Sequence, residues 1–181
     1  MVGTLEWWPV GERLDLVAEP VAAALEKLGA AADEVRVAEI DPELADTAAF
    51  CKTYDVGLDI SANCVVVGAK RSGERTLAAC VVLATARADV NGLVRRHLDA
   101  RKVSFAPMDQ AVAETGMEYG GITPIGLPAA WPLLVDEAVA ATELAVVGSG
   151  RRRSKLLLPG RLLGQLPGSV VLADLAQPLG A

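Results

Sequence analysis

Residues 115–126 read Thr-Gly-Met-Glu-Tyr-Gly-Gly-Ile-Thr-Pro-Ile-Gly, and this stretch decides more about the chain than any other. Its paired glycines, Gly120 and Gly121, allow positive φ and a close approach of a ligand to the backbone. Pro124 then fixes the chain three residues later. Such a loop can direct several N–H groups at a developing oxyanion, where one donor is typically worth about 3–4 kcal/mol. An ordinary tight turn between a helix and a strand uses the same residue types, so spacing alone leaves both interpretations open.

The sequence around this loop predicts an α+β fold. Two runs rich in β-branched residues, 63–69 and 76–85, flank a charged loop with a glycine and predict a β-hairpin. Shorter strands are expected at 34–40, 102–105, 133–135, 144–147, 155–158 and 169–172. Helical spacing and capping residues predict helices at about 20–28, 42–54, 89–98, 107–116 and 160–166. Helices interspersed among strands, without strict βαβ alternation, indicate a mixed sheet.

Length and charge distribution set the broad class. A chain of 181 residues with 52% hydrophobic and 22% charged side chains is typical of one globular domain. Its net charge of −6 argues against binding nucleic acid by wholesale neutralisation of phosphates. The charge is uneven, however: residues 1–60 carry 13 acidic and 4 basic side chains, whereas residues 144–173 carry five basic and no acidic ones. Local contact of this basic segment with an anionic partner therefore stays open.

Cysteine usage and hydropathy favour a reducing, aqueous compartment. The three cysteines, Cys51, Cys64 and Cys80, have no CxxC spacing, so neither a disulfide framework nor a zinc site is indicated. The N-terminus lacks a basic region followed by an apolar one, and the longest apolar stretch, 77–86, is far shorter than a membrane span. We therefore expect a soluble, cytoplasmic protein without a membrane partner.

Common enzyme templates are not found in the sequence. The single histidine, His97, lies on the apolar face of a predicted helix, where a partly buried structural role is expected. No Walker A loop or GxGxxG follows a strand, and Gly148-Ser149-Gly150 is not a GxSxG nucleophile elbow. No histidines, cysteines or carboxylates are spaced as ligands, so neither a metal nor another cofactor is expected.

The pattern Thr-Gly-x-x-x-Gly-Gly-Ile-x-Pro-x-Gly closely resembles the signature of the YbaK/ProX family of aminoacyl-tRNA editing domains. This family includes free-standing deacylases and the insertion domain of bacterial prolyl-tRNA synthetases. Weaker similarities in the predicted hairpin, in residues 101–105 and in residues 147–151 extend the match over about 45–173. The resemblance implies an α+β domain with a mixed, barrel-like sheet surrounded by helices. It divides the chain into an N-terminal extension, 1–45, the editing domain, 45–173, and a C-terminal tail, 174–181.

The same resemblance implies a trans-editing deacylase, which hydrolyses the ester between a wrong amino acid and the 3′ adenosine of tRNA. Editing exists because a synthetase pocket distinguishes small side chains by only about 1–3 kcal/mol. In the family, water attacks with help from substrate groups such as the terminal ribose hydroxyl, and no covalent enzyme intermediate forms. The implied partner is the 3′ aminoacyl end of a mischarged tRNA, and an aminoacyl-tRNA synthetase is a further candidate. The oligomeric state is left open.

Roles carry over from the family residue by residue. Gly120 and Gly121 are catalytic candidates, and so is Asn63, which stands at the position of the family's hallmark lysine. The substrate-binding candidates are Ile122, Thr123, Pro124, Ser149 and Gly150. The basic run supplies candidates for tRNA binding, although such a run is usually a solvated face. These are Arg151, Arg152, Arg153 and Lys155.

Two departures from the family pattern keep a second function open. Asn63 can donate a hydrogen bond but carries no positive charge, and Lys70, an odd seven positions on, falls on the opposite face of the strand. Lys155 stands near the position where many members carry an acidic residue. The alternative to a deacylase is therefore a non-catalytic module that binds a tRNA end or an aminoacyl-adenosine-like ligand.

Overall fold

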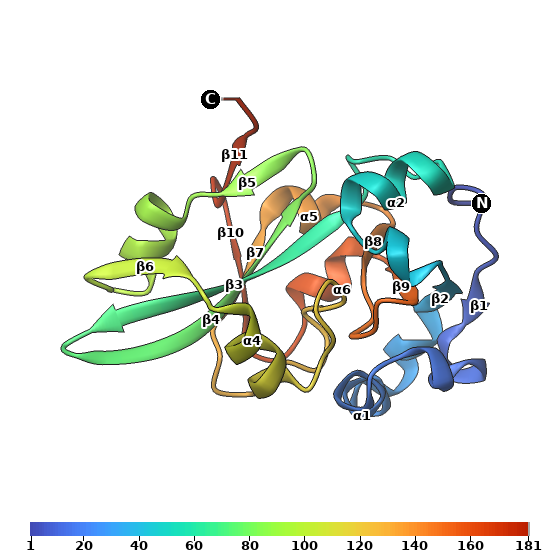
Figure 1. Cartoon of the computed structure of the whole chain (residues 1–181), viewed down its shortest axis with the longest axis horizontal. Coiled ribbons are helices and arrows are strands. Elements are labelled where there is room, and N and C mark those ends of the chain that lie inside the picture. The colour runs from blue at the N-terminus through green and yellow to red at the C-terminus, as the bar shows by residue number, and fades with distance from the viewer. Residues whose placement is uncertain (181) are drawn as a thin grey trace.

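The computed structural model describes residues 1–180 and contains a five-stranded and a four-stranded sheet with helices around them (Figure 1). A small antiparallel ribbon joins β5 (Ala86–Ala88) to β11 (Ala176–Pro178). The predicted α+β class with a mixed sheet is confirmed. The strands do not close into a barrel, because within residues 1–180 the two larger sheets are joined only by an isolated parallel bridge between Ser61 and Val146.

The five-stranded sheet is built around the predicted hairpin. Its strands, in spatial order, are β10 (Ser169–Leu172), β7 (Leu133–Asp136), β4 (Glu74–Leu83), β3 (Ala62–Arg71) and β6 (Lys102–Phe105). β3 and β4 pair in register from Ala62 opposite Leu83 to Arg71 opposite Glu74. β7 and β10 add in parallel beyond β4, whereas β6 is antiparallel to β3, and this makes the sheet mixed.

The four-stranded sheet combines two strands from the first 40 residues with two strands from residues 145–158. Its order is β1 (Trp8–Pro9), β2 (Arg36–Glu39), β9 (Ser154–Leu158) and β8 (Ala145–Gly148), with all neighbours antiparallel. In the pairing of β2 with β9, Val37 lies opposite Leu156. The first 40 residues therefore supply β1 and β2. β2 is hydrogen-bonded to β9, which follows the glycine-rich loop in the sequence, and β1 is hydrogen-bonded to β2.

Short helices cover the sheets and position the loops. They are α1 (Glu19–Leu28), α2 (Thr47–Tyr54), α3 (Arg95–His97), α4 (Met108–Thr115), α5 (Glu137–Ala141) and α6 (Gly160–Gly164), with short 3-10 segments and a π-helical segment, Val90–Val94. Asp46 caps α2, because its carboxylate accepts hydrogen bonds from the backbone N–H groups of Ala48 and Ala49. None of the helices formed by residues 1–180 combines the length and apolarity needed to span a membrane.

The prediction that His97 is partly buried is wrong. Its side chain is exposed at the end of α3. The reason is local: the segment begins as a π-helix, whose wider turn shifts the side chains that follow away from the regular 3.6-residue face.

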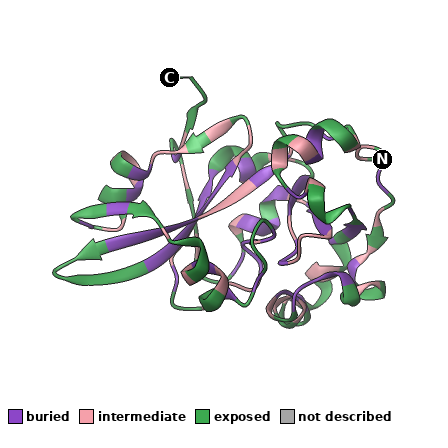
Figure 2. Cartoon of the chain, viewed as in Figure 1, coloured by how far each residue is buried: buried purple, intermediate pink, exposed green. Residues whose placement is uncertain are grey.

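Both larger sheets are buried on both faces along their central strands (Figure 2). On β9, Leu156 and Leu158 belong to the main core with α1 and α6, whereas Leu157 packs on the other face with Phe50 of α2. Because side chains alternate along a strand, Lys155 lies on the same face as Leu157. The fold therefore directs this lysine beneath α2.

Candidate functional site

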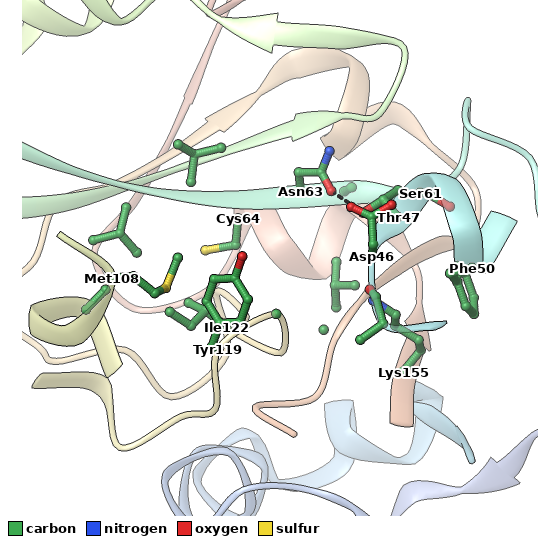
Figure 3. Close-up of a pocket in the computed structure, with 18 of the residues that line it drawn as sticks. Asp46, Thr47, Phe50, Ser61, Asn63, Cys64, Met108, Tyr119, Ile122 and Lys155 are labelled. Atoms are coloured by element: carbon green, nitrogen blue, oxygen red, sulfur yellow. Dashed lines mark hydrogen bonds between the residues drawn. The ribbon is translucent and has the colours of Figure 1, made fainter. Parts of the chain in front are cut away.

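A pocket of about 410 Å³ opens where the start of β3, the end of β8, the first turn of α2 and the glycine-rich loop meet (Figure 3). The polar side chains in its lining include Thr47 of α2, Asn63 of β3 and Lys155 of β9. The apolar ones come from α2, β3, β6, α4, β8 and the loop. Of the residues predicted for the site, Asn63, Gly120, Ile122 and Lys155 line this pocket. The structure thus brings Asn63 and Lys155, which are far apart in the sequence, into one pocket.

The glycine-rich loop is held by backbone hydrogen bonds to the turn after β8. Glu118 N–H donates to the Gly150 carbonyl (2.9 Å), and Gly150 N–H donates to the Gly121 carbonyl (2.7 Å). Gly121 N–H is used within the loop, where it donates to the Glu118 carbonyl (2.9 Å). The Gly121 N–H is therefore engaged within the loop, and the loop residues that line the pocket are Tyr119, Gly120 and Ile122.

Two glycines allow the loop and β8 to approach each other this closely. A Cβ on Gly121 would lie 2.6–2.8 Å from backbone atoms of Arg151. A Cβ on Gly148 would lie 2.6 Å from the Gly121 carbonyl oxygen and 2.8 Å from that of Ile122. Both distances are shorter than any real Cβ contact, so a side chain at either position must displace backbone. The sequence indicated the loop glycines but gave Gly148 no role of its own.

Several predicted substrate-binding residues lie behind the pocket wall. Thr123 and Pro124 are buried and do not line the pocket. The Thr123 hydroxyl is the buried side-chain group without a hydrogen-bond partner in the part of the chain that the structure describes. Gly150 faces α1, because a Cβ there would meet Ala18 and Val21.

Ser149 also supports the turn from behind. Its hydroxyl lies 2.6 Å from that of Ser154 and accepts a hydrogen bond from the Arg151 N–H (3.2 Å). Ser154 in turn donates to the Leu16 carbonyl (2.6 Å), and both serines are buried. This network fixes the turn that receives the glycine-rich loop.

Asn63 reaches the pocket at the first turn of α2. The Thr47 hydroxyl donates to Asn63 Oδ1 at 2.7 Å, which orients the Asn63 amide. Both residues line the pocket (Figure 3). Lys70 is exposed near the far end of β3 and does not line the pocket.

Lys155 is the buried cation of the pocket. Its side chain is 7% exposed, its Nζ donates to the Ala45 carbonyl (3.0 Å), and the same atom lies 5.1 Å from the centre of the Phe50 ring. Burial lowers the pKa of Lys155 to about 8, against the opposing influence of Cys51 and Asp46. The sequence groups Lys155 with the arginines that precede it, but the structure separates it from them.

The three arginines donate hydrogen bonds to backbone carbonyls of other segments, and none of them lines the pocket. Arg151 Nε donates to Val17 O (2.9 Å), and Arg153 Nη2 donates to Asp15 O (2.8 Å). Arg152 donates to Tyr119 O (3.2 Å) and Pro42 O (2.9 Å), while its own N–H donates to the Glu118 carboxylate (2.8 Å). All three are half-buried, so each keeps part of its surface in solvent.

Burial holds two thiols, Cys64 of β3 and Cys80 of β4, in the protonated form. Burial raises the pKa of Cys64 far above its ordinary value and that of Cys80 to about 12. Because the thiolate is the nucleophilic form, this environment disfavours attack by Cys64, although it lines the pocket. Residues 1–180 contain no cluster of three or more histidine, cysteine or carboxylate side chains arranged to hold a metal ion.

Comparisons with known proteins agree with this geometry. The family model of the aminoacyl-tRNA editing domain matches residues 41–165. Among solved structures, the hypothetical protein APE2540 is similar with a TM-score of 0.75 and 22% identity, over 88% of this chain and 100% of that one. A proposed trans-editing enzyme for prolyl tRNA synthetase is similar with a TM-score of 0.73 and 20% identity, over 87% and 95% of the two chains. Among curated proteins, none matches the chain.

The two structural similarities show a shared fold, and the family match covers more than half of the sequence. It includes the glycine-rich loop, β3, β8, β9 and therefore the whole lining of the pocket. The chain belongs to the aminoacyl-tRNA editing domain family.

Proposed function

We propose that this protein is a trans-acting deacylase, which hydrolyses the ester bond of a mischarged aminoacyl-tRNA. The observation that carries the proposal is that Lys155 and the glycine-rich loop line one pocket. The pocket therefore contains an ammonium group, supplied from β9, although Asn63 stands at the position that the resemblance assigns to the family's lysine. The Asp46 carboxylate also lines the pocket, where it caps α2. An ammonium group that can stabilise a developing negative charge favours a catalytic pocket over a non-catalytic binding module.

In the proposed reaction, a water oxygen attacks the ester carbonyl carbon, and the bond from this carbon to the ribose oxygen breaks. The ribose oxygen takes up a proton and becomes a hydroxyl, and the amino acid leaves as a carboxylate with release of a proton to solvent. The Lys155 ammonium and the backbone of Gly120 and Ile122 stabilise the negative charge that develops on the carbonyl oxygen. The raised thiol pKa values support water, rather than a cysteine, as the attacking group.

A panel of mischarged tRNAs tests the proposal. We expect the protein to release the amino acid from at least one of them faster than the spontaneous rate. The assay should include tRNAs that carry small side chains, because these are the ones that synthetases distinguish least well. Binding of the tRNAs without faster release from any of them would support the non-catalytic module instead.

The pH dependence of deacylation reports whether the ammonium of Lys155 is needed. A lysine is charged below its pKa, and the pKa of Lys155 is lowered to about 8, so the catalysed rate divided by the spontaneous rate should fall as the pH rises through about 8. In the Lys155→Arg variant this fall should disappear, because a guanidinium stays protonated throughout the range. Rapid-mixing deacylation between pH 6.5 and 9 measures both profiles. A wild-type ratio that stays level across this range would show that the charge of Lys155 is not required.

The three arginines beside the pocket are expected to contact tRNA phosphates. Replacing Arg151, Arg152 and Arg153 with alanine should weaken tRNA binding and reduce its salt dependence by roughly one unit of slope for each phosphate that is no longer neutralised. The matched control replaces Arg95 and Arg96, which are exposed on α3, and should leave the slope unchanged. Because the three arginines also bind carbonyls, the thermal unfolding of each variant must be measured. If the folded triple variant showed the same salt dependence of tRNA binding as the wild type, the three arginines would form a solvated face without phosphate contacts.

A further inference from the structure

Three large apolar side chains stand exposed at the mouth of the pocket. Phe105 is 69% exposed at the end of β6, Tyr119 is 58% exposed in the glycine-rich loop, and Met108 is 44% exposed at the start of α4. All three line the pocket that contains Lys155. We call these three residues the apolar rim. Figure 3 shows Met108 and Tyr119 toward the side of the pocket away from Lys155.

It is unusual for three large apolar side chains to be exposed together at one site. Single exposed apolar residues are normal on a protein surface, but a cluster of them marks a binding surface. Phe105 and Tyr119 are the most exposed aromatic side chains among residues 1–180, where Phe50 and Trp131 are buried and Trp8 is 37% exposed. The apolar rim also continues inward into a buried cluster that includes Val66 and Ala111, so a flat apolar group placed there would have apolar surface beneath it.

A cation accompanies the rim. The guanidinium carbon of Arg152 lies 5.7 Å from the centre of the Tyr119 ring, and its Nη1 donates to the Tyr119 carbonyl. Aromatic side chains beside an arginine form the combination that binds single-stranded nucleic acid, because bases stack on the rings while the cation attracts the phosphate. The base of a nucleotide has a flat apolar face, and the phosphate of the nucleotide is anionic. A nucleotide therefore matches both the apolar rim and Arg152.

We propose that Phe105 and Tyr119 hold the base of the 3′-terminal nucleotide of tRNA by stacking, with Met108 packing beside it. This subsite rests on the proposed function, because it would place the esterified ribose over the glycine-rich loop and the carbonyl group toward Lys155. Stacking does not depend on hydrogen bonds to the base edge, so the rim recognises a terminal base without reading the rest of the tRNA sequence.

The test uses an RNA oligonucleotide that carries no amino acid and has the single-stranded acceptor end of tRNA. The last base of this RNA is 2-aminopurine. Fluorescence of this base is quenched when it stacks. We expect wild-type protein to quench it on binding, and the variants Phe105→Leu and Tyr119→Leu to bind about 5- to 150-fold more weakly with less quenching. Tyr119→Phe keeps the ring and should behave as wild type. The matched control is Trp8→Leu, which removes an exposed aromatic ring that does not line the pocket and should change nothing.

A second RNA without a base on the last nucleotide completes the experiment. Wild-type protein should bind this RNA more weakly than the RNA with the base, whereas a variant with leucine at both Phe105 and Tyr119, which has no ring for the base to stack on, should bind the two RNAs about equally. The leucine variants retain an exposed apolar side chain, and a thermal melt checks that they are folded. Unchanged quenching and affinity in both leucine variants, or no quenching by the wild type, would overturn the inference and leave the rim to a protein partner.

These results are independent of turnover, because the RNA carries no amino acid. Quenching that depends on Phe105 and Tyr119 would stand even if no mischarged tRNA were hydrolysed. Conversely, hydrolysis at the wild-type rate by a protein with leucine at both positions would refute the stacking role of Phe105 and Tyr119 and would leave the deacylase proposal in place.

Discussion

Replacing Lys155 with methionine is expected to lower kcat/KM for deacylation by about 10²–10³-fold, the usual cost of removing one group that stabilises an oxyanion. The same change is expected to raise the melting temperature. Burial of this charge, which is 7% exposed, lowers its pKa despite the contacts with the Ala45 carbonyl and the Phe50 ring, so the charge is destabilising there. A methionine of similar length fills the same space without the charge. Loss of activity together with a gain in stability is the pattern of a residue retained for function.

The pH dependence of this stability effect has a definite sign. The pKa of Lys155 is about 8 in the folded protein, against 10.5 for an ordinary lysine, so between these values the unfolded chain binds more protons. The stability of the wild type therefore rises with pH across this interval, and its deficit relative to Lys155→Met should be largest below pH 8. Thermal melts of both proteins from pH 6.5 to 10 measure this difference.

The control for Lys155→Met is Lys70→Met, which removes an exposed lysine from β3 outside the pocket. It should leave both deacylation and the melting temperature near wild type. Wild-type activity in folded Lys155→Met would refute the role assigned to the pocket cation. A lower melting temperature for Lys155→Met would show instead that the lysine contributes to the stability of the fold.

Replacing Gly148 with alanine is expected to abolish measurable deacylation and to destabilise the protein by about 1–3 kcal/mol, the range for overpacking a well-packed site. The added Cβ would lie 2.6 Å from the Gly121 carbonyl oxygen, so the glycine-rich loop must move away from β8. Such a shift takes Gly120 and Ile122 out of their place in the pocket, and small displacements of catalytic groups have large effects on rate. Deacylation assays and denaturant unfolding measure the two effects.

Gly11→Ala is the matched control, because no atom lies within 4 Å of a Cβ placed on Gly11. This variant should be as active and at least as stable as the wild type. If Gly148→Ala retained full activity, the close contact between the loop and β8 would not be what shapes the site.

The sequence predicted much of this architecture because its local signals agree with the fold. The hairpin around Ser72 and Gly73, the helix that follows Pro20 and the irregular segment after Gly116 all appear where periodicity and turn residues indicate them. The loop signature also identified the family correctly. Elements of two or three residues, such as β1 and β5, carry no periodic signal, so the sequence does not reveal them.

The site was less predictable, because its geometry depends on contacts between distant segments. Lys155 follows three arginines and reads as part of a charged surface, yet the alternation with Leu157 along β9 puts it beneath α2. The alternation of side chains along the predicted strand was the signal in the sequence that could have placed Lys155 beneath a helix. The role of Gly148 depends on a backbone contact with Gly121, 27 positions away, and no local pattern reports it.

Single-turnover deacylation, with the protein in excess over a mischarged tRNA chosen from the panel, shows most directly whether the pocket catalyses hydrolysis. We expect the first-order rate of amino acid release to rise with protein concentration and to reach a plateau, as binding followed by hydrolysis in the pocket requires. Release at the spontaneous rate at every protein concentration, with the tRNA demonstrably bound, would contradict catalysis by the pocket.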